Sequence, residues 1–219
     1  MKKIAWKKLW GSFLIGILLV IPVFASPVVP SVSAEVAAKM LVEGNRRFVS
    51  GQYAPRALGQ ARRIELVKGQ HPFAVVISCS DSRVPPELVF DQGLGDLFVI
   101  RVAGNVLDAI GLGSVEYAVE HFGVKLIVVL GHEKCGAVRA TIDGGEAPPN
   151  VRAILDKIKP AVASAKANQP ENIVAAAEDA NISNMVAYLK SNHQFAQVKD
   201  LNILGAKYYL DSGEVKFVP

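Results

Sequence analysis

Two cysteines and one histidine in this sequence could together bind a metal ion. Cys79 and Cys135 are the only two cysteines, and His132 lies three residues before Cys135. Two thiolates and one imidazole suit a catalytic zinc ion, which keeps its fourth position for water. The same cysteines could instead form a disulfide in an oxidising compartment. The spacing favours the metal site, but the residues alone leave both alternatives open.

A charged pair follows the first cysteine closely. Asp81 lies two residues after Cys79, and Arg83 lies two residues after Asp81. A guanidinium can hold a carboxylate through two parallel hydrogen bonds, which a lysine cannot reproduce. The structural alternative is that Asp81 caps a helix and Arg83 forms a surface ion pair. The position beside a candidate ligand favours a role in the site.

The elements that must position these residues can be read from the hydrophobic pattern. Short apolar runs rich in β-branched residues predict buried strands at 73–78, 96–101 and 125–130. Amphipathic or apolar stretches predict helices at 35–51, 56–68, 106–122, 148–167 and 171–190. Two further strands, at 201–210 and 214–218, are expected to form a hairpin around an Asp-Ser-Gly turn.

Strands that alternate with helices predict an α/β fold with a mostly parallel central sheet flanked by helices. In such sheets, ligands bind beyond the carboxyl ends of the strands. Cys79 follows the first predicted strand, and His132 follows the third. We therefore expect the candidate ligands to meet at one edge of the sheet.

Residues 1–34 have the features of an export signal. Lys2, Lys3, Lys7 and Lys8 precede an almost wholly apolar stretch at 9–24, and Val32-Ser33-Ala34 has the small-x-small pattern of a cleavage site. We expect a signal peptide at 1–34, one domain at 35–219, and a periplasmic or extracellular location. Cleavage after Ala25 is a second candidate. Retention as a membrane anchor is another alternative, although the apolar run is shorter than the ~20 residues that a span prefers.

The charge balance argues against a nucleic-acid partner. The chain has 24 basic and 20 acidic residues, and the four lysines before residue 35 account for the whole excess. No basic run interleaved with aromatic residues occurs in the remainder. About half of the residues (51%) are hydrophobic, which is enough to fill a core.

The motifs C-S-D-S-R at 79–83 and G-H-x-x-C-G at 131–136 resemble those of the β-class carbonic anhydrases. The stretch at 95–105 is also similar, and the resemblance runs from about residue 43 to residue 208. It implies one Zn2+ per chain, held by Cys79, His132 and Cys135. It also implies a carbonate dehydratase, in which zinc-bound hydroxide attacks carbon dioxide to give bicarbonate and a proton.

The same resemblance assigns roles to the neighbouring residues. Arg83 would hold the Asp81 carboxylate in an open state, and Asp81 would accept a hydrogen bond from the zinc hydroxide. In a closed state, Asp81 would become the fourth zinc ligand. The plant-like branch of the family implies a homodimer or tetramer in which the neighbouring subunit helps to line the pocket. The pocket residues would be Gln70, Phe98, Gly104, Tyr117 and Gly136.

One position separates this chain from another branch of the family. That branch binds inhibitory bicarbonate with a tryptophan three residues before the first cysteine, where this chain has Val76. Arg101 occupies a second position of that site, but an arginine there is not diagnostic. We therefore expect no strong inhibition by bicarbonate at such a site.

Two other functions remain compatible with the sequence. The scaffold could hydrolyse carbonyl sulfide or carbon disulfide, because a fold does not fix a substrate. The chain could also be a non-catalytic exported module stabilised by zinc or by a disulfide.

Overall fold

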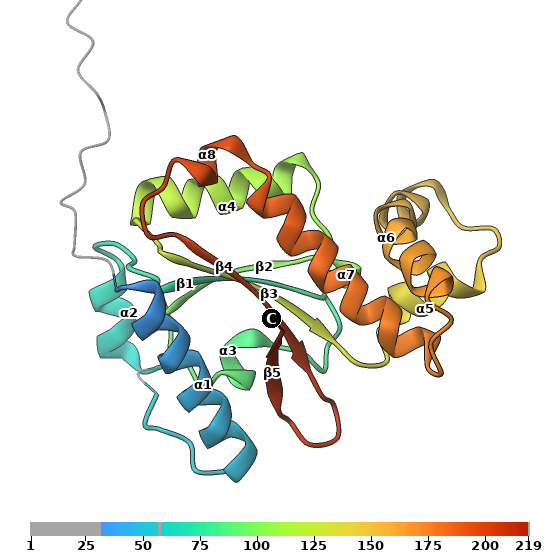
Figure 1. The fold of residues 1–219 in the computed structure, drawn as a ribbon. Helices are drawn as coiled ribbons and strands as arrows, with labels where there is room; N and C mark the ends of the chain where they lie inside the picture. The colour runs from blue at the N-terminus through green and yellow to red at the C-terminus, as the bar shows by residue number, and fades with distance from the viewer. Residues whose placement is uncertain (1–31, 57, 219) are drawn as a thin grey trace, which may run out of the picture.

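The computed structural model describes residues 32–56 and 58–218 (Figure 1). Five strands form one sheet in the order β2-β1-β3-β4-β5. Strands β2, β1, β3 and β4 are parallel to one another, and β5 is antiparallel to β4. The strands are β1 (Ala74–Ser78), β2 (Leu97–Arg101), β3 (Leu126–His132), β4 (Asn202–Tyr208) and β5 (Val215–Val218). The predicted α/β fold, with its parallel sheet and closing hairpin, is confirmed.

The two central strands are buried on both faces, as their continuous apolar sequences predicted. Every residue of β1 and β3 is buried. Their side chains alternate between the two faces of the sheet, so each strand contributes to two separate clusters. Val75 and Ile77 belong to one hydrophobic cluster, whereas Ala74 and Val76 belong to the other.

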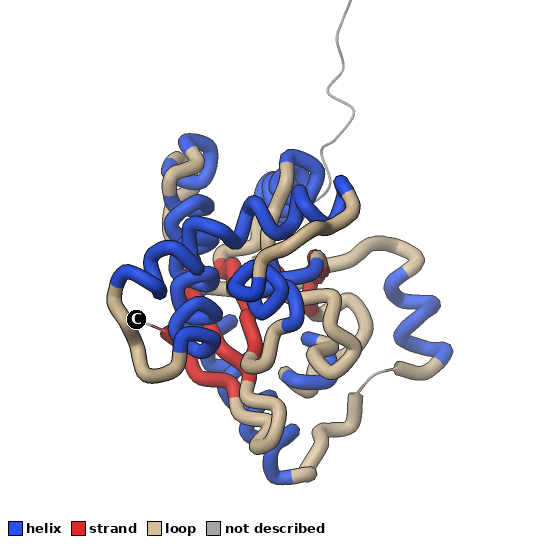
Figure 2. The backbone as a smooth tube through the Cα atoms, turned by 90° about the vertical axis from the view of Figure 1, so that its right-hand side faces the viewer, coloured by secondary structure: helices blue, strands red, loops and turns tan. Residues whose placement is uncertain are grey.

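Helices cover both faces of the sheet (Figures 1 and 2). On one face, α1 (Ala34–Ser50) and α3 (Pro86–Val89) contribute Ala37, Leu41 and Val89 to the core. The other face is covered by α4 (Ala109–Phe122) and α7 (Ile173–Lys190), which belong to the larger cluster. The remaining helices are α2 (Gln60–Leu66), η1 (Ala103–Asn105), α5 (Gly136–Asp143), α6 (Pro149–Ala167) and α8 (His193–Ala196).

Several predicted boundaries need correction. The helix expected at 106–122 begins only at Ala109, because Asp108 caps it by accepting a hydrogen bond from the Gly111 amide at 2.8 Å. The helix expected at 56–68 is limited to Gln60–Leu66. The third strand extends to His132, so this residue ends β3 rather than following it. The short helices α3, α5 and α8 were not predicted, because one or two turns carry too little periodicity to recognise.

The start of the first helix bears on the predicted signal peptide. Ser33 is the N-cap of α1, and its side chain accepts a hydrogen bond from the Val36 amide at 3.3 Å. Most of the predicted signal, residues 1–31, lies outside the described residues. Within the described part of the chain, no helix combines the length and hydropathy needed to cross a bilayer.

Candidate metal centre

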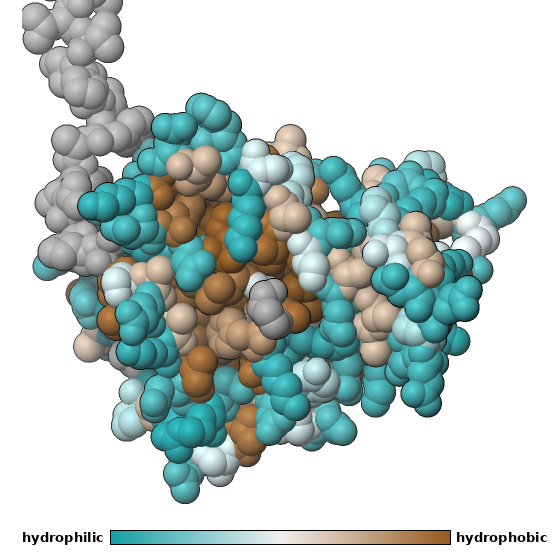
Figure 3. All heavy atoms as spheres, viewed as in Figure 1, coloured by the Kyte–Doolittle hydropathy of each residue, from teal (hydrophilic) through white to brown (hydrophobic). Residues whose placement is uncertain are grey.

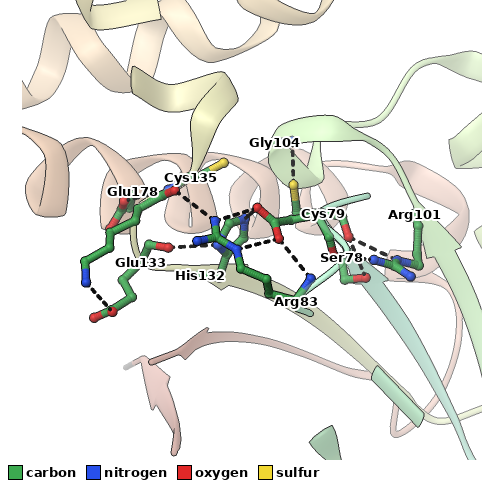
Figure 4. Close-up of polar contacts among 11 residues, drawn as sticks. Ser78, Cys79, Arg83, Arg101, Gly104, His132, Glu133, Cys135 and Glu178 are labelled. Atoms are coloured by element: carbon green, nitrogen blue, oxygen red, sulfur yellow. Dashed lines mark hydrogen bonds and ion pairs between the residues drawn. The ribbon is translucent and has the colours of Figure 1, made fainter. Parts of the chain in front are cut away.

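The three candidate ligands converge at the carboxyl edge of the sheet (Figure 4). One donor atom each from Cys79, His132 and Cys135 lies within 4.8 Å of the other two. Cys79 directly follows β1, and His132 is the last residue of β3. A tight turn then brings Cys135 back beside His132, with Lys134 in the left-handed region at φ 54°. All three side chains are buried.

The tautomer of His132 leaves one ring nitrogen available for a metal ion. Its Nδ1 lies 2.8 Å from the Glu133 carbonyl oxygen, which can only accept, so Nδ1 carries the proton. The other nitrogen, Nε2, is buried and has no hydrogen-bond partner. A buried nitrogen without a partner is costly unless a ligand satisfies it. The donor set therefore fits zinc, whose histidine ligands are commonly oriented by this kind of backbone contact.

The two cysteines are free thiols rather than a disulfide. A hydrogen bond from Cys135 lowers the pKa of Cys79 to about 4, and the Gly104 amide at 3.2 Å also stabilises the Cys79 thiolate. Conversely, the hydrogen bond to Cys79 and then burial raise the pKa of Cys135 above its ordinary value. The protein alone therefore favours a single negative charge on the pair. A bound divalent cation would allow both thiols to ionise.

Asp81 and Arg83 form the bidentate pair that the resemblance implies for the open state. Arg83 donates from Nε to Asp81 Oδ1 at 2.9 Å and from Nη2 to Oδ2 at 2.7 Å. This guanidinium holds the pKa of Asp81 well below its usual range. The Oδ2 atom also lies 4.0 Å from His132 Nε2. An ionised carboxylate thus borders the space between the candidate ligands.

Arg101 supports the backbone of the first motif. From the end of β2, it donates to the carbonyl oxygens of Cys79 at 3.1 Å and of Asp81 at 2.6 Å. Sequence reasoning had considered Arg101 only as part of an inhibitory anion site. Val76, the other position of that site, is fully buried in the interior of β1.

The predicted pocket residues fall into two groups. Gly104 and Gly136 lie at the cluster: the Gly104 amide contacts Cys79, and Gly136 begins α5 directly after Cys135. A side chain added at Gly136 would meet nothing within 4 Å, so space is open beside it. The remaining residues, Gln70, Phe98 and Tyr117, form no hydrogen bond or ion pair with the three ligand candidates in the described part of the chain. Phe98 and Tyr117 instead pack against Phe122 of the same chain, at ring-centroid distances of 5.9 and 5.5 Å.

Three buried polar residues near the site were not identified from the sequence. Glu178 and Asn181 of α7 and Lys207 of β4 are each at most 5% exposed. Glu178 contacts the Cys135 backbone although it lies 43 residues away in the chain. Their only sequence signal is the presence of charged or amide side chains within otherwise apolar elements.

The fold and the cluster together define a metalloenzyme of the α/β class, with two cysteines and one histidine at the carboxyl edge of a parallel sheet. The family model for carbonic anhydrase matches residues 74–215, a range that contains all three ligand candidates. The chain therefore belongs to the carbonic anhydrase family, and its structural relatives are of the β class.

Individual relatives agree with this assignment. A carbonic anhydrase of Mycolicibacterium smegmatis is 50% identical over 137 residues, which are 61% of this chain and 66% of the relative. Carbonic anhydrase 2 of Mycobacterium tuberculosis is 40% identical over 192 residues, or 84% of this chain and 92% of the relative. A structure of a tetrameric β-carbonic anhydrase from Sordaria macrospora has a TM-score of 0.65 and 25% identity, and the match covers 71% of this chain and 85% of that one.

These matches assign the reaction as well as the fold. The protein is a zinc-dependent carbonate dehydratase, which interconverts carbon dioxide and bicarbonate. The cluster of Cys79, His132 and Cys135 is able to bind the metal ion that this reaction requires.

Proposed function

We propose that Cys79, His132 and Cys135 are the protein ligands of one zinc ion in each chain. The observation that carries this assignment is the buried Nε2 of His132, which has no partner and lies beside two free thiols. A catalytic zinc with three protein ligands keeps one position open. When bound there, the ion supplies a Lewis acid that lowers the pKa of water and so provides a nucleophile near neutral pH.

Asp81 and Arg83 are proposed to orient the attacking water. Because Arg83 keeps Asp81 ionised, this carboxylate can only accept a hydrogen bond. A water that donates to Asp81 must turn an oxygen lone pair in another direction, where carbon dioxide can meet it. Two thiolates give the site more negative charge than neutral ligands would and so would acidify the water less, which leaves orientation of the water as the role of Asp81.

The substrate pocket is proposed to be completed by a neighbouring subunit, as in the plant-like branch. Gly104 and Gly136 would border it from within the chain. Gln70, Phe98 and Tyr117 would reach it from the partner. Tyr117 is 48% exposed in the single chain, so it is free to meet a second copy.

Apolar surface on the single chain supports a homodimer or tetramer. Hydrophobic residues gather around the C-terminal strands in Figure 3. Val36 of α1 and Ile64 of α2 are 48% and 59% exposed, and Val67, directly after α2, is 86% exposed. Monomeric proteins rarely leave large contiguous apolar surface uncovered. The related Sordaria proteins are described as tetrameric.

The N-terminal segment is proposed to direct the protein out of the cytoplasm, to the periplasm or beyond. Its lysines and apolar stretch are the support for this proposal. Cleavage after Ala34 would remove the Ser33 cap of α1, whereas cleavage after Ala25 would retain it. N-terminal sequencing of the protein recovered from cells decides between these sites and an uncleaved anchor.

A thiol titration tests the proposed ligand set. In the zinc-loaded protein, Cys79 and Cys135 should react slowly, and removal of zinc by a chelator should expose two reactive thiols per chain. Replacement of His132 by alanine should abolish the protection without removing a thiol. Absence of any reactive thiol in the metal-free protein after unfolding without a reductant would instead indicate a disulfide, and equal reactivity with and without zinc would exclude these cysteines as ligands.

A further inference from the structure

One turn of α7 contacts backbone groups beside both candidate thiolate ligands. Glu178 Oε1 accepts the backbone N–H of Cys135 at 3.1 Å (Figure 4). Three residues later, Asn181 Nδ2 donates to the carbonyl oxygen of Gly104 at 2.8 Å. The amide of Gly104 in turn points at Cys79 Sγ from 3.2 Å. Because residues three apart share one face of a helix, a single turn reaches both sides of the cluster.

Glu178 is itself held by a buried lysine. Lys207 Nζ lies 2.9 Å from Glu178 Oε2 and 2.9 Å from Asp179 Oδ1. The side chains of Glu178 and Lys207 are only 3% and 7% exposed, whereas that of Asp179 is 50% exposed. A buried carboxylate is costly unless it is paired and fully hydrogen-bonded. With one oxygen on Lys207 and the other on the Cys135 amide, Glu178 has a single favoured orientation.

We propose that Glu178 and Asn181 are positioning residues for the zinc site, and that Lys207 is the counter-ion that fixes Glu178. The inference rests on the proposed ligand set. Glu178 fixes the turn that ends at Cys135, and Asn181 fixes the carbonyl of Gly104, the residue whose own N–H stabilises the Cys79 sulfur. Each side chain contacts the backbone beside the ligands, so we expect both to act by holding the two sulfurs at a fixed separation. Contacts that orient ligands in this way typically change metal affinity by about 10–100-fold.

The test measures zinc affinity rather than turnover alone. Glu178→Ala and Asn181→Ala are compared with two matched controls from the same helix, Asp179→Asn and Ser183→Ala. Asp179 also pairs with Lys207 but does not contact Cys135, and Ser183 bonds only within its helix. Competition with a chromophoric chelator gives the zinc dissociation constant. The thiolate-to-metal absorption of the cobalt-substituted protein reports how many sulfurs bind.

We expect both site variants to raise the zinc dissociation constant about 10–100-fold and to weaken the cobalt–thiolate band. The two controls should match the wild type. Wild-type affinity in a folded Glu178→Ala protein, or an equal loss in Asp179→Asn, would overturn the proposal. If the wild type itself showed no cobalt–thiolate band, the ligand set would fail instead.

A second variant covers the case in which Glu178→Ala does not fold. Glu178→Ala combined with Lys207→Met removes both buried charges together, which is commonly tolerated better than removal of one partner. The Cys135 amide still loses its acceptor in this protein. Zinc affinity should therefore stay reduced, and recovery of wild-type affinity would contradict the proposed role of Glu178.

Discussion

At the scale of single residues, the local motifs contain most of the chemistry. Cys79, Asp81 and Arg83 lie within five residues, as do His132 and Cys135, so their types and spacing are visible in the sequence. The residues that hold them are not. Glu178 and Asn181 reach the site from 43 and 77 residues away, and no spacing rule connects them to it. Only the three-dimensional packing of α7 reveals these contacts.

Replacement of Asp81 by alanine tests the role of the charged pair. The variant should lose a correctly oriented nucleophile and its catalytic rate constant should fall about 10²-fold or more, because groups that manage protons contribute on this scale. Zinc should remain at one ion per chain, since Asp81 pairs with Arg83 rather than with the candidate ligands. Stopped-flow hydration assays and metal analysis give both values. Loss of zinc from this variant would mean that Asp81 is structural.

At the scale of elements, the buried strands were predicted well because each is a continuous apolar run. Helix boundaries were predicted less well where a cap or a 3-10 turn decides them. Asp108 starts α4 three residues later than the apolar pattern suggested, and η1 ends at Asn105, before the predicted start of that helix. Such boundaries depend on individual side-chain hydrogen bonds, which periodicity does not detect.

Close contact between α7 and β3 depends on a glycine. A Cβ atom at Gly131 would lie 2.5 Å from Cγ1 of the buried Ile182, so the Ile182 side chain would have to shift within the core. We expect Gly131→Ala to destabilise the protein by about 1–3 kcal/mol, as overpacking does. Gly113→Ala is the control, because an added Cβ there meets nothing within 4 Å. Urea unfolding measures both variants, and equal stability of the two would contradict the predicted contact.

The buried carboxylate of Asp91, just after α3, forms ion pairs and a hydrogen bond with α1 and with the loop that follows α1. Asp91 pairs with Arg47 at 2.6 Å and with Arg56 at 3.3 Å, and it accepts the Ala54 amide at 2.9 Å. Burial opposes ionisation of Asp91, but these partners outweigh it and hold its pKa below the ordinary value. Its contribution to stability is therefore complete above an unfolded-state pKa of about 3.9 and is lost as pH falls through the lower folded-state pKa.

Asp91→Asn should cost about 1.5–3 kcal/mol of unfolding free energy at pH 7 in the metal-free protein. The difference between wild type and variant should shrink as the pH falls below about 3.9 and approaches the lower folded-state pKa, because Asp91 then becomes protonated in the wild type as well. Urea titrations at several pH values provide the measurement. A difference that stays constant down to pH 3 would show that the charge of Asp91 does not stabilise the fold.

At the scale of the whole molecule, the fold class and the family were predicted from the sequence, whereas the shared substrate pocket is a proposal that rests on the resemblance. The single chain leaves Tyr117 exposed, and Phe98 packs against Phe122. The pattern of one chain alone does not place residues that a neighbouring subunit would contribute.

Subunit association should therefore control activity. Light scattering should give a molar mass of at least twice the 23.5 kDa of the full chain, or of its processed form. Dilution below the dissociation constant of the dimer should lower the activity per chain, because we propose that the neighbouring subunit completes the pocket. A monomer that retains full activity at every concentration would contradict this arrangement.

The measurement that tests the central claim most directly is carbon dioxide hydration by the zinc-loaded protein, followed with a stopped-flow pH indicator. The account predicts rapid hydration that disappears when zinc is removed and returns when it is restored, with Cys79→Ser inactive. Carbonyl sulfide and carbon disulfide should be tested in parallel. Negligible hydration at both neutral and alkaline pH, with one zinc ion confirmed per chain, would contradict the account and favour the sulfur-containing substrates.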